Sequence, residues 1–578
     1  MHLLHHLLPL LLTSVLYTAA GPTPAASQCR CLYGEPCWPS QSTFSALSDQ
    51  LSQPILHPVP PESACYPPSS PSGNCSALLS SFDNGDWRAD QPGAMQLPNF
   101  QTYTLPNGTI EACYMNVSLG VPCEQGSVPP IGVDARTVED VRAAVVFARQ
   151  NNLRLVVKNT GHDYLGRSTG RGAFMLWTHH LKNMTFDQEF VPDGAPSSAE
   201  KVSNAVTLGS GVAWHEAYDF VQERGRFILG GISVGGTVGA AGGWIMGAGH
   251  SAFAPTFGLG VDNVLQFTIV LASGQHIAAN AYQNTDLFWA LRGGGGGTYG
   301  VVTSVTYRTH PVFSLSMAVL TANFSSMDIA QSVITKFIKS QPAWSDKGWG
   351  GYSSINSSSF QLQYVAPNVS TADMNATLSP FVDFVSNATQ GASQIAYQNF
   401  SSFIEWYAAT YSQGPPQVGY PILGANRLLS RALAAENPAQ VAEKLLSLNG
   451  GVLGTLSVAG GAVSEVDPSS MSVFPAWRTA VAELYNTVTW PEGSPNSVIQ
   501  EQVQALERNT EILNEITPDS ASYMNEGSPY EKDFKKSFFG DHYTKLKDIK
   551  FKYDPASLFV VPLGVGSDEW DSDLRCPV

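Results

Sequence analysis

The side chains best suited to chemistry are an imidazole and a phenol, His162 and Tyr164, which stand close together in the sequence. They follow the polar run Lys158-Asn159-Thr160-Gly161, whose residue types turn a chain and leave backbone N–H groups free. Free N–H groups in such a turn can hold an anion such as a phosphate. The turn therefore predicts a ligand site beside His162. The plainer alternative is a histidine in a polar turn that ends a strand.

The elements that must position this turn are two strands and a helix between them. The largely apolar run 153–157 predicts a buried strand that ends at the turn. Upstream, Pro129-Pro130-Ile131 begins another strand. Thr137 is the expected N-cap of an amphipathic helix with apolar residues at 141, 144, 145 and 148. A strand–helix–strand unit would thus deliver the chain to His162.

A second stretch, residues 230–243, is dense in glycine and has hardly a side chain large enough to keep a ligand away from the backbone. It contains neither a Walker loop nor a Gly-x-Gly-x-x-Gly after a strand, so P-loop and dinucleotide Rossmann sites are excluded on spacing. We expect a flat or phosphorylated ligand to approach this backbone closely. The alternative is a glycine-rich structural loop.

These motifs, taken in order, resemble one known family. The Lys-x-x-Gly-His pattern at 158–162, the blocks 257–265 and 272–274, the run 286–297 and the segment 300–303 are similar to the vanillyl-alcohol-oxidase superfamily, in particular its berberine-bridge-enzyme-like branch. The resemblance is close over 125–310, thin over the following region, and clear again near the C-terminus.

The resemblance implies an FAD cofactor joined covalently to His162 through the C8 methyl group of the flavin. It also implies cofactor contacts from Lys158, Asn159, Thr160, Gly161, Asp163, Tyr164, Ser168, Gly235, Gly236, Thr237, Gly239, Gly242, Val301 and Asn525. Many members hold the flavin by a second bond from a cysteine, and that place falls on Gly235 here. No cysteine lies between residues 124 and 575, so we expect a singly linked flavin.

The catalytic base is expected in the segment Ser522-Tyr523-Met524-Asn525-Glu526. Plant members of the family read Tyr-x-Asn-Tyr there, and Glu526 replaces the final tyrosine that often serves as the base. The altered motif looks more like secreted fungal isoamyl-alcohol-oxidase-like and hydroxynicotine-oxidase-like proteins. A tyrosine, with an ordinary pKa of about 10, must be activated by a cation, whereas a glutamate at about 4.3 is already a base. Both Tyr523 and Glu526 therefore stay as candidates.

Composition limits the class of protein. Hydrophobic residues make up 43% and charged residues 13% of the 578 residues, which indicates large buried cores and excludes a disordered chain. The formal net charge of −16 disfavours contacts with phosphate backbones, so no nucleic-acid partner is expected.

Several features indicate export. Residues 1–20 predict a signal peptide, with a signal anchor as the alternative, and no later run is long and apolar enough to span a bilayer. Ten Asn-x-Ser/Thr sequons predict N-glycans, at Asn74, Asn107, Asn116, Asn183, Asn323, Asn356, Asn368, Asn375, Asn387 and Asn399. We expect a secreted protein that has no membrane contact after signal cleavage.

The eight cysteines are even in number, as in a disulfide framework. We expect the local pairs Cys65–Cys75 and Cys113–Cys123, and a bridge from Cys29, Cys31 or Cys37 to Cys576. Ligand spacing for zinc is missing around Cys29-x-Cys31, and we expect no metal site.

The chain divides into a signal peptide at 1–20, a Cys/Pro-rich extension at 21–124, an FAD-binding domain at 125–310, a substrate domain at 311–519 and a C-terminal segment at 520–578 that returns to the FAD domain. The expected fold class is α+β. The resemblance implies a two-lobed FAD-binding domain of the PCMH type with α/β subdomains, and a separate substrate domain of one sheet plus helices.

The function that the resemblance implies is a secreted FAD-dependent oxidase. It would transfer a hydride from an alcohol-type or secondary-metabolite substrate to the flavin, and O₂ would be reduced to H₂O₂. The alternatives are a carbohydrate oxidase or an oxidative-cyclisation enzyme of the same fold, or a flavin-binding protein without turnover.

Overall fold

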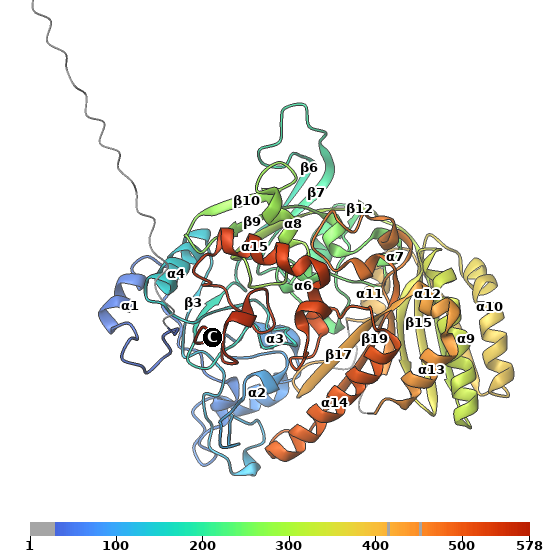
Figure 1. The fold of residues 1–578 in the computed structure, drawn as a ribbon, viewed down its shortest axis with the longest axis horizontal. Coiled ribbons are helices and arrows are strands. Elements are labelled where there is room, and N and C mark those ends of the chain that lie inside the picture. The colour runs from blue at the N-terminus through green and yellow to red at the C-terminus, as the bar shows by residue number, and fades with distance from the viewer. Residues whose placement is uncertain (1–28, 413–416, 450–452) are drawn as a thin grey trace, which may run out of the picture.

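The structure is a computed structural model that describes residues 29–412, 417–449 and 453–578 (Figure 1). The predicted signal peptide lies outside the described residues. Three sheets, of three, five and seven strands, organise the described part of the chain.

The three-stranded sheet is parallel, with the order β3-β5-β4. Its elements are β3 (Ile131–Asp134), α4 (Val138–Gln150), β4 (Leu155–Lys158) and β5 (Phe174–Trp177). The predicted cap is confirmed, because the Thr137 hydroxyl accepts from the Asp140 N–H and the Asp140 carboxylate accepts from the Thr137 N–H. Strand β4 begins later than expected, since Leu153 instead forms an isolated bridge with Cys31.

The five-stranded sheet is antiparallel, with the order β10-β9-β11-β7-β6. Its strands are β6 (Met184–Phe190), β7 (Val202–Gly209), β9 (Val264–Val270), β10 (His276–Asn280) and β11 (Val301–Arg308). The intervening helices are α5 (Trp214–Gln222), α6 (Gly243–Gly247), α7 (Ala254–Phe257) and α8 (Thr285–Leu291), and β8 (Arg226–Phe227) pairs with β12 (His310–Pro311). The β6–β7 hairpin projects from the top of the molecule (Figure 1).

The seven-stranded sheet is antiparallel, with the order β16-β13-β15-β14-β18-β19-β17. Its strands are β13 (Leu315–Asn323), β14 (Gly350–Ile355), β15 (Ser359–Pro367), β16 (Ser393–Phe400), β17 (Ile422–Ser430), β18 (Leu453–Ser457) and β19 (Ala480–Thr489). Its helices are α9 (Met327–Ser345), α10 (Thr371–Ala388), α11 (Phe403–Thr410), α12 (Arg431–Glu436), α13 (Pro438–Ser447) and α14 (Asn496–Ile516). Helices α9, α10 and α13 form one buried core with this sheet and cover its outer face, as Figure 1 shows.

The N-terminal segment contains α1 (Gln41–Ser48), α2 (Cys75–Ser81), α3 (Gly85–Ala89), β1 (Tyr103–Thr104) and β2 (Ile110–Glu111). The expected pairs Cys65–Cys75 and Cys113–Cys123 are confirmed. Cys29 bonds Cys576 across 547 residues, and Cys31 bonds Cys37. Among these four bridges, Cys29–Cys576 is therefore the one that ties the segment to another part of the chain.

The C-terminal segment packs back onto the three-stranded sheet. After α15 (Tyr543–Tyr553), Leu558 and Phe559 enter the core that holds Val133 and Phe174. Lys550 of α15 donates to the Thr298 carbonyl at 2.7 Å, which ties the helix to the loop before β11.

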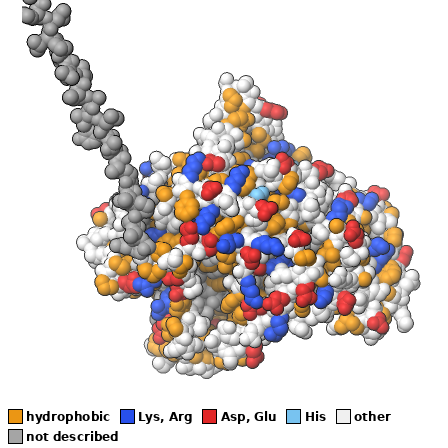
Figure 2. Space-filling model, viewed as in Figure 1, with side chains coloured by type: hydrophobic (Ala, Val, Ile, Leu, Met, Phe, Trp, Pro, Cys, Tyr) orange, Lys and Arg blue, Asp and Glu red, His pale blue; other side chains and the backbone are white. Residues whose placement is uncertain are grey.

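The architecture is α+β, as expected: the three-stranded and five-stranded sheets lie beside a seven-stranded sheet covered by helices. The domain boundaries given above stay predictions. Acidic and basic side chains are interspersed over the face seen in Figure 2. No helix in the described part of the chain is long and apolar enough to cross a membrane.

Candidate active site

A large cavity lies where the three-stranded and five-stranded sheets meet the C-terminal segment. Its empty space, which includes its open mouth, is about 1320 Å³. The walls are the turn after β4, the glycine-rich residues 238–244, the start of β11 and the short helix η8 (Met524–Glu526). Residues far apart in the sequence thus share one hollow, whose size suits a large ligand.

His162 lies on the wall of this cavity, in the turn after β4. Its Nε2 and the Thr237 hydroxyl are 2.8 Å apart in a hydrogen bond. Burial lowers the pKa of His162 to about 4, although the negative charge of Asp86 acts in the opposite direction. The imidazole is therefore neutral at ordinary pH, and its ring nitrogens can act as nucleophile or acceptor.

The turn offers hydrogen-bond donors to a ligand. Within the described residues, the backbone N–H groups of Thr160, Gly161 and His162 have no acceptor. The carboxylate of Asp163 folds the turn back by accepting from the Leu165 and Ser168 N–H groups at 3.0 and 2.6 Å. Three N–H groups without an acceptor in one turn can serve as a cradle for an anion, the kind of ligand that the sequence predicts there.

Two polar side-chain atoms at the cavity wall are buried and have no partner among the described residues. They are Asn159 Oδ1 and Ser210 Oγ. Because buried polar atoms are almost always hydrogen-bonded, these two atoms indicate a polar ligand. The cradle, the two unpartnered atoms and the cavity fit a phosphorylated cofactor such as FAD.

The glycine-rich stretch has a structural reason in addition to the one that the sequence suggested. A Cβ on Gly239 would lie 2.1 Å from Asn159 Nδ2, and one on Gly242 would lie 3.0 Å from it. These glycines leave room for the Asn159 side chain, which donates to the Ser210 carbonyl at 2.6 Å. Gly239 and Gly242 also line the cavity, so a ligand can still approach them.

Four residues expected to contact the cofactor lie outside the cavity wall: Lys158, Gly235, Gly236 and Thr237. The two glycines have positive φ angles of 72° and 64°, in the short helix η4 (Val234–Gly236). Lys158 is buried behind the turn and donates to the carbonyls of Gln91 and Pro92 at 2.6 and 3.1 Å. Burial lowers the pKa of Lys158 to about 7. These residues support the wall.

Thr237 is likewise behind the wall, where it contacts His162. The remaining expected positions do line the cavity: Asn159, Thr160, Gly161, His162, Asp163, Tyr164, Ser168, Gly239, Gly242, Val301, Tyr523, Asn525 and Glu526.

A cluster of acidic and basic groups stands at the end of the cavity near η8. His250 Nε2 lies 2.9 Å from Glu526 Oε1 and 3.7 Å from Glu483 Oε2. The Glu526 side chain is 25% exposed, whereas that of Glu483 is 0% exposed. Glu526 is therefore the carboxyl group that a substrate can reach.

Glu483 is a buried carboxyl group on β19. Its neighbours on the adjacent strands are Leu428 and Leu456, and neither of its carboxyl oxygens has a hydrogen-bond partner among the described residues. Burial, and then the charge of Glu526, raise the pKa of Glu483 well above its ordinary value. Glu483 therefore keeps its proton to a higher pH than an ordinary glutamate does.

Neither His250 nor Glu483 was expected from the sequence. His250 stands in an unremarkable Gly-His-Ser run, and Glu483 interrupts the apolar run Ala480-Val481-Ala482. For Glu483, the sequence did contain one signal: a single acidic residue in an otherwise apolar strand. Acidic groups are rarely buried unless they are paired or have a function, so this pattern could have indicated a functional residue.

Tyr523, the second candidate base, is buried beside this cluster. Its hydroxyl accepts from Asn525 Nδ2 at 2.9 Å. Burial, and then the charge of Glu526, raise the pKa of Tyr523 well above 10. The same two causes, in the same order, raise the pKa of Tyr164. Both tyrosines therefore stay protonated and can donate hydrogen bonds.

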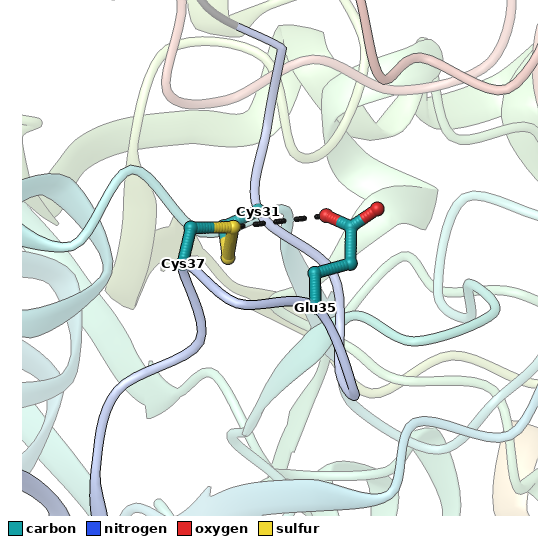
Figure 3. Close-up of side chains that lie close together, drawn as sticks. All are labelled: Cys31, Glu35 and Cys37. Carbon is teal, nitrogen blue, oxygen red and sulfur yellow. Dashed lines mark hydrogen bonds between the residues drawn. A yellow bond between two sulfur atoms is a disulfide. The ribbon is translucent and has the colours of Figure 1, made fainter.

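A second group of side chains whose atoms could bind a metal ion lies in the N-terminal segment, far from Glu526 in the sequence. Cys31, Glu35 and Cys37 come within 4.8 Å of one another. The two sulfur atoms are bonded to each other, and Figure 3 shows the Glu35 carboxylate pointing at them. Glu35 Oε2 is 3.7 Å from Cys37 Sγ. This group offers no thiolate to a metal ion.

Comparisons with known proteins agree with this geometry. Residues 129–280 match the family described as "FAD binding domain", and residues 522–566 match "Berberine and berberine like". An FAD-linked oxidoreductase of Arthroderma benhamiae, itself uncharacterised, is 35% identical over 593 aligned residues, which cover 96% of this chain and 97% of that protein.

Two further relatives are flavoproteins by name. The VAO-type flavoprotein oxidase VAO615 of Thermothelomyces thermophilus is 32% identical, with 96% of each chain covered. The crystal structure of the VAO-type flavoprotein MtVAO615 from Myceliophthora thermophila C1 superposes with a TM-score of 0.84 and 30% identity, and covers 95% of this chain and all of that one.

Full-length similarity, the two matched domains and the cavity with its anion cradle lead to one conclusion. The chain belongs to the FAD-linked oxidoreductases of the vanillyl-alcohol-oxidase type that carry a berberine-like C-terminal segment.

Proposed function

We propose that this enzyme is a secreted oxidase that holds FAD covalently through His162. It takes a hydride from an alcohol-type or secondary-metabolite substrate, and the electrons pass to O₂ to give H₂O₂. The observation that supports this most strongly is that the cavity joins the His162 turn to the cluster of His250, Glu483 and Glu526.

FAD, when bound, supplies the hydride acceptor and the route of electrons to O₂. The N–H groups of residues 160–162 would hold its phosphates, and Asn159 Oδ1 and Ser210 Oγ would find partners in it. His162 is the side chain for the covalent bond, because it is neutral and stands on the wall.

A single covalent bond follows from the cysteines. One solved structure of similar fold, a glucooligosaccharide oxidase from Acremonium strictum with 19% identity and a TM-score of 0.62, is described with a 6-S-cysteinyl, 8α-N1-histidyl FAD. The position that the family motif assigns to that cysteine is Gly235 here, and all eight cysteines are in disulfides. The thiol bond therefore has no counterpart in this chain.

We assign the base role to Glu526. Its carboxylate faces the cavity and shares a hydrogen bond with His250, which would receive the substrate proton next. Glu483, kept protonated by burial, leaves one negative charge in the cluster rather than two. Tyr523 keeps its proton and would instead donate a hydrogen bond to the substrate oxygen.

Secretion is supported by the surface of the molecule. All ten sequon asparagines are exposed, and four disulfides close the eight cysteines. Disulfides persist in oxidising compartments, where N-glycans are also added.

The proposal is tested first by colour and mass. The purified protein should be yellow and stay yellow after acid precipitation, and the tryptic peptide that holds Gly161-His162-Asp163 should carry the flavin mass. His162→Ala should bind FAD without a covalent bond and be reduced slowly. An unmodified peptide from active enzyme would contradict the covalent bond.

The substrate class needs a screen. Alcohols, aromatic alcohols and oligosaccharides should be tested for peroxide release in air and for bleaching of the flavin without air. Peroxide release from oligosaccharides alone would make the enzyme a carbohydrate oxidase. Bleaching without peroxide release would make it a dehydrogenase, and a flavin that no substrate bleaches would leave a binding protein.

A further inference from the structure

The two ring nitrogens of His162 have different surroundings. Nε2 is bonded to the Thr237 hydroxyl at 2.8 Å, and Thr237 is buried behind the cavity wall. Nδ1 forms no hydrogen bond with any residue in the described part of the chain. Because Nε2 already takes part in a hydrogen bond, Nδ1 is the nitrogen that can form a covalent bond with a ligand in the cavity.

Thr237 is held firmly in place. A Cβ on Gly85, at the start of α3, would lie 2.6 Å from Thr237 Oγ1, so the helix packs directly on the hydroxyl. On the other side, the Trp214 N–H donates to the Val238 carbonyl at 3.0 Å. Ala213 forms an isolated bridge with Gly239. Thr237 is thus held between α3, which packs on its hydroxyl, and the start of α5, which binds the backbone directly after it.

We infer that Thr237 is the positioning residue for flavin attachment, because its hydroxyl holds His162 Nε2 and presents Nδ1 to the flavin methyl group. This inference rests on the proposed covalent bond to His162. Thr237 is not a catalytic residue in this sense, since it acts through the imidazole.

Attachment forms one bond and breaks two. A C–N bond forms between Nδ1 and the methyl carbon of the flavin. One C–H bond of the methyl group and the imidazole N–H bond break. The two protons and two electrons released in this way reduce the flavin ring, and O₂ then takes them from the ring and leaves as H₂O₂. No other oxidant is needed.

A hydroxyl group suits this step because it can both accept and donate a hydrogen bond. Before the attack, the Thr237 oxygen accepts the Nε2–H, which leaves the lone pair on Nδ1. After the C–N bond has formed and Nε2 has lost its proton, the hydroxyl donates to Nε2 instead. The neutral imidazole is available because burial outweighs the nearby charge of Asp86.

The experiment compares three variants with the wild-type enzyme. Thr237→Val removes the hydroxyl and keeps the shape, and Thr237→Ser keeps the hydroxyl. Thr306→Val is the matched control: Thr306 is also buried and also makes one hydroxyl bond of 2.8 Å, to Thr207 in the five-stranded sheet. Each protein is freed of loosely bound flavin and incubated with excess FAD in air.

The measured quantity is the fraction of flavin that stays with acid-precipitated protein, followed over time, with total bound FAD measured in parallel. Thr237→Val should bind FAD but attach it at least about 10-fold more slowly, because a misdirected nucleophile loses its orientation. Thr237→Ser and Thr306→Val should attach FAD at nearly the wild-type rate.

Other outcomes would overturn the inference. Attachment by Thr237→Val at the wild-type rate would show that the hydroxyl has no part in orienting His162. Slow attachment in both Thr237→Val and Thr237→Ser, or loss of all FAD binding in Thr237→Val alone, would make Thr237 a packing residue. Wild-type protein without covalent flavin would instead refute the proposed covalent bond, which is a distinguishable result.

Discussion

Replacement of Glu526 by glutamine tests the proposed base most directly. The change keeps the shape of the side chain and its hydrogen bond to His250, but it removes the carboxylate that would accept the substrate proton. General-base catalysis contributes about 10²–10⁴ in rate, which corresponds to about 3–5 kcal/mol. The rate of flavin reduction should fall within this range, while substrate binding changes little.

The structure places the expected loss at the lower end. The charge of Glu526 is one cause of the raised pKa of Glu483, so its removal lets Glu483 ionise at a lower pH. Glu483 Oε2 is 3.7 Å from His250 Nε2, close enough to take over part of the proton transfer through the imidazole. We therefore expect Glu526→Gln to lose about 10², and the double variant with Glu483→Gln to lose about 10⁴.

The assay is anaerobic stopped-flow reduction of the bound flavin, with the substrate that releases peroxide fastest in the screen. The rate is measured from acid to alkaline pH for the wild type, both single variants and the double variant. In a double-mutant cycle, coupled residues give non-additive losses. Glu483→Gln alone should reduce the flavin at close to the wild-type rate, because Glu526 remains.

Two results would refute this reasoning. A Glu526→Gln variant that reduces the flavin at the wild-type rate would mean that another group accepts the proton. Strictly additive losses in the two single variants would mean that the two carboxyl groups do not share the role through His250.

Further predictions concern stability and the remaining candidate residues. The pKa of Glu483 is raised in the folded state. The neutral carboxyl group therefore contributes its full share of stability below the ordinary pKa of about 4.3. This contribution is lost as the pH rises toward the folded-state pKa, because the unfolded chain then releases its proton first. Glu483→Gln should therefore melt higher than the wild type at alkaline pH, with the gap closing in acid, and an equal gap at all pH values would argue against a neutral buried carboxyl. Tyr523→Phe removes a hydrogen bond rather than a base. Flavin reduction should therefore slow by about 10-fold or less, since one hydrogen bond contributes about 0.5–1.5 kcal/mol. A loss of about 10³ or more, within the range of about 10²–10⁴ for a catalytic base, would assign the base role to Tyr523. Denatured, unreduced protein should contain no free thiol. The double variant Cys29→Ser, Cys576→Ser should have a free energy of unfolding lower by about 2–4 kcal/mol in a denaturant titration. An unchanged unfolding midpoint would show that this bridge does not stabilise the fold.

Local patterns in the sequence were sufficient for much of the framework. The cap at Thr137 and the strand that begins at Ile131 depend on neighbouring residues alone, and both were predicted. So were the two bridges that close ten-residue separations, since nearby cysteines meet often. The polar turn before His162 was recognised because its residue types and spacing carry the motif.

The exact ends of the elements and the roles of the glycines were harder to predict from the sequence, because they depend on residues from elsewhere in the chain. Strand β4 was expected to begin at residue 153 and instead begins at Leu155, because Leu153 forms an isolated bridge with Cys31 of the N-terminal segment. Gly239 and Gly242 were expected to admit a ligand, and they also make room for Asn159, which the sequence places 80 and 83 positions away.

The acid–base cluster was decided by tertiary structure alone. His250, Glu483 and Glu526 come from the segment after α6, a strand of the seven-stranded sheet and the C-terminal return. No local pattern connects them, because their distances depend on how three separately formed elements pack. The burial that keeps Glu483 protonated and His162 neutral is likewise a property of the packed chain. The sequence by itself determined which cofactor to expect, and the tertiary structure decided which groups surround it.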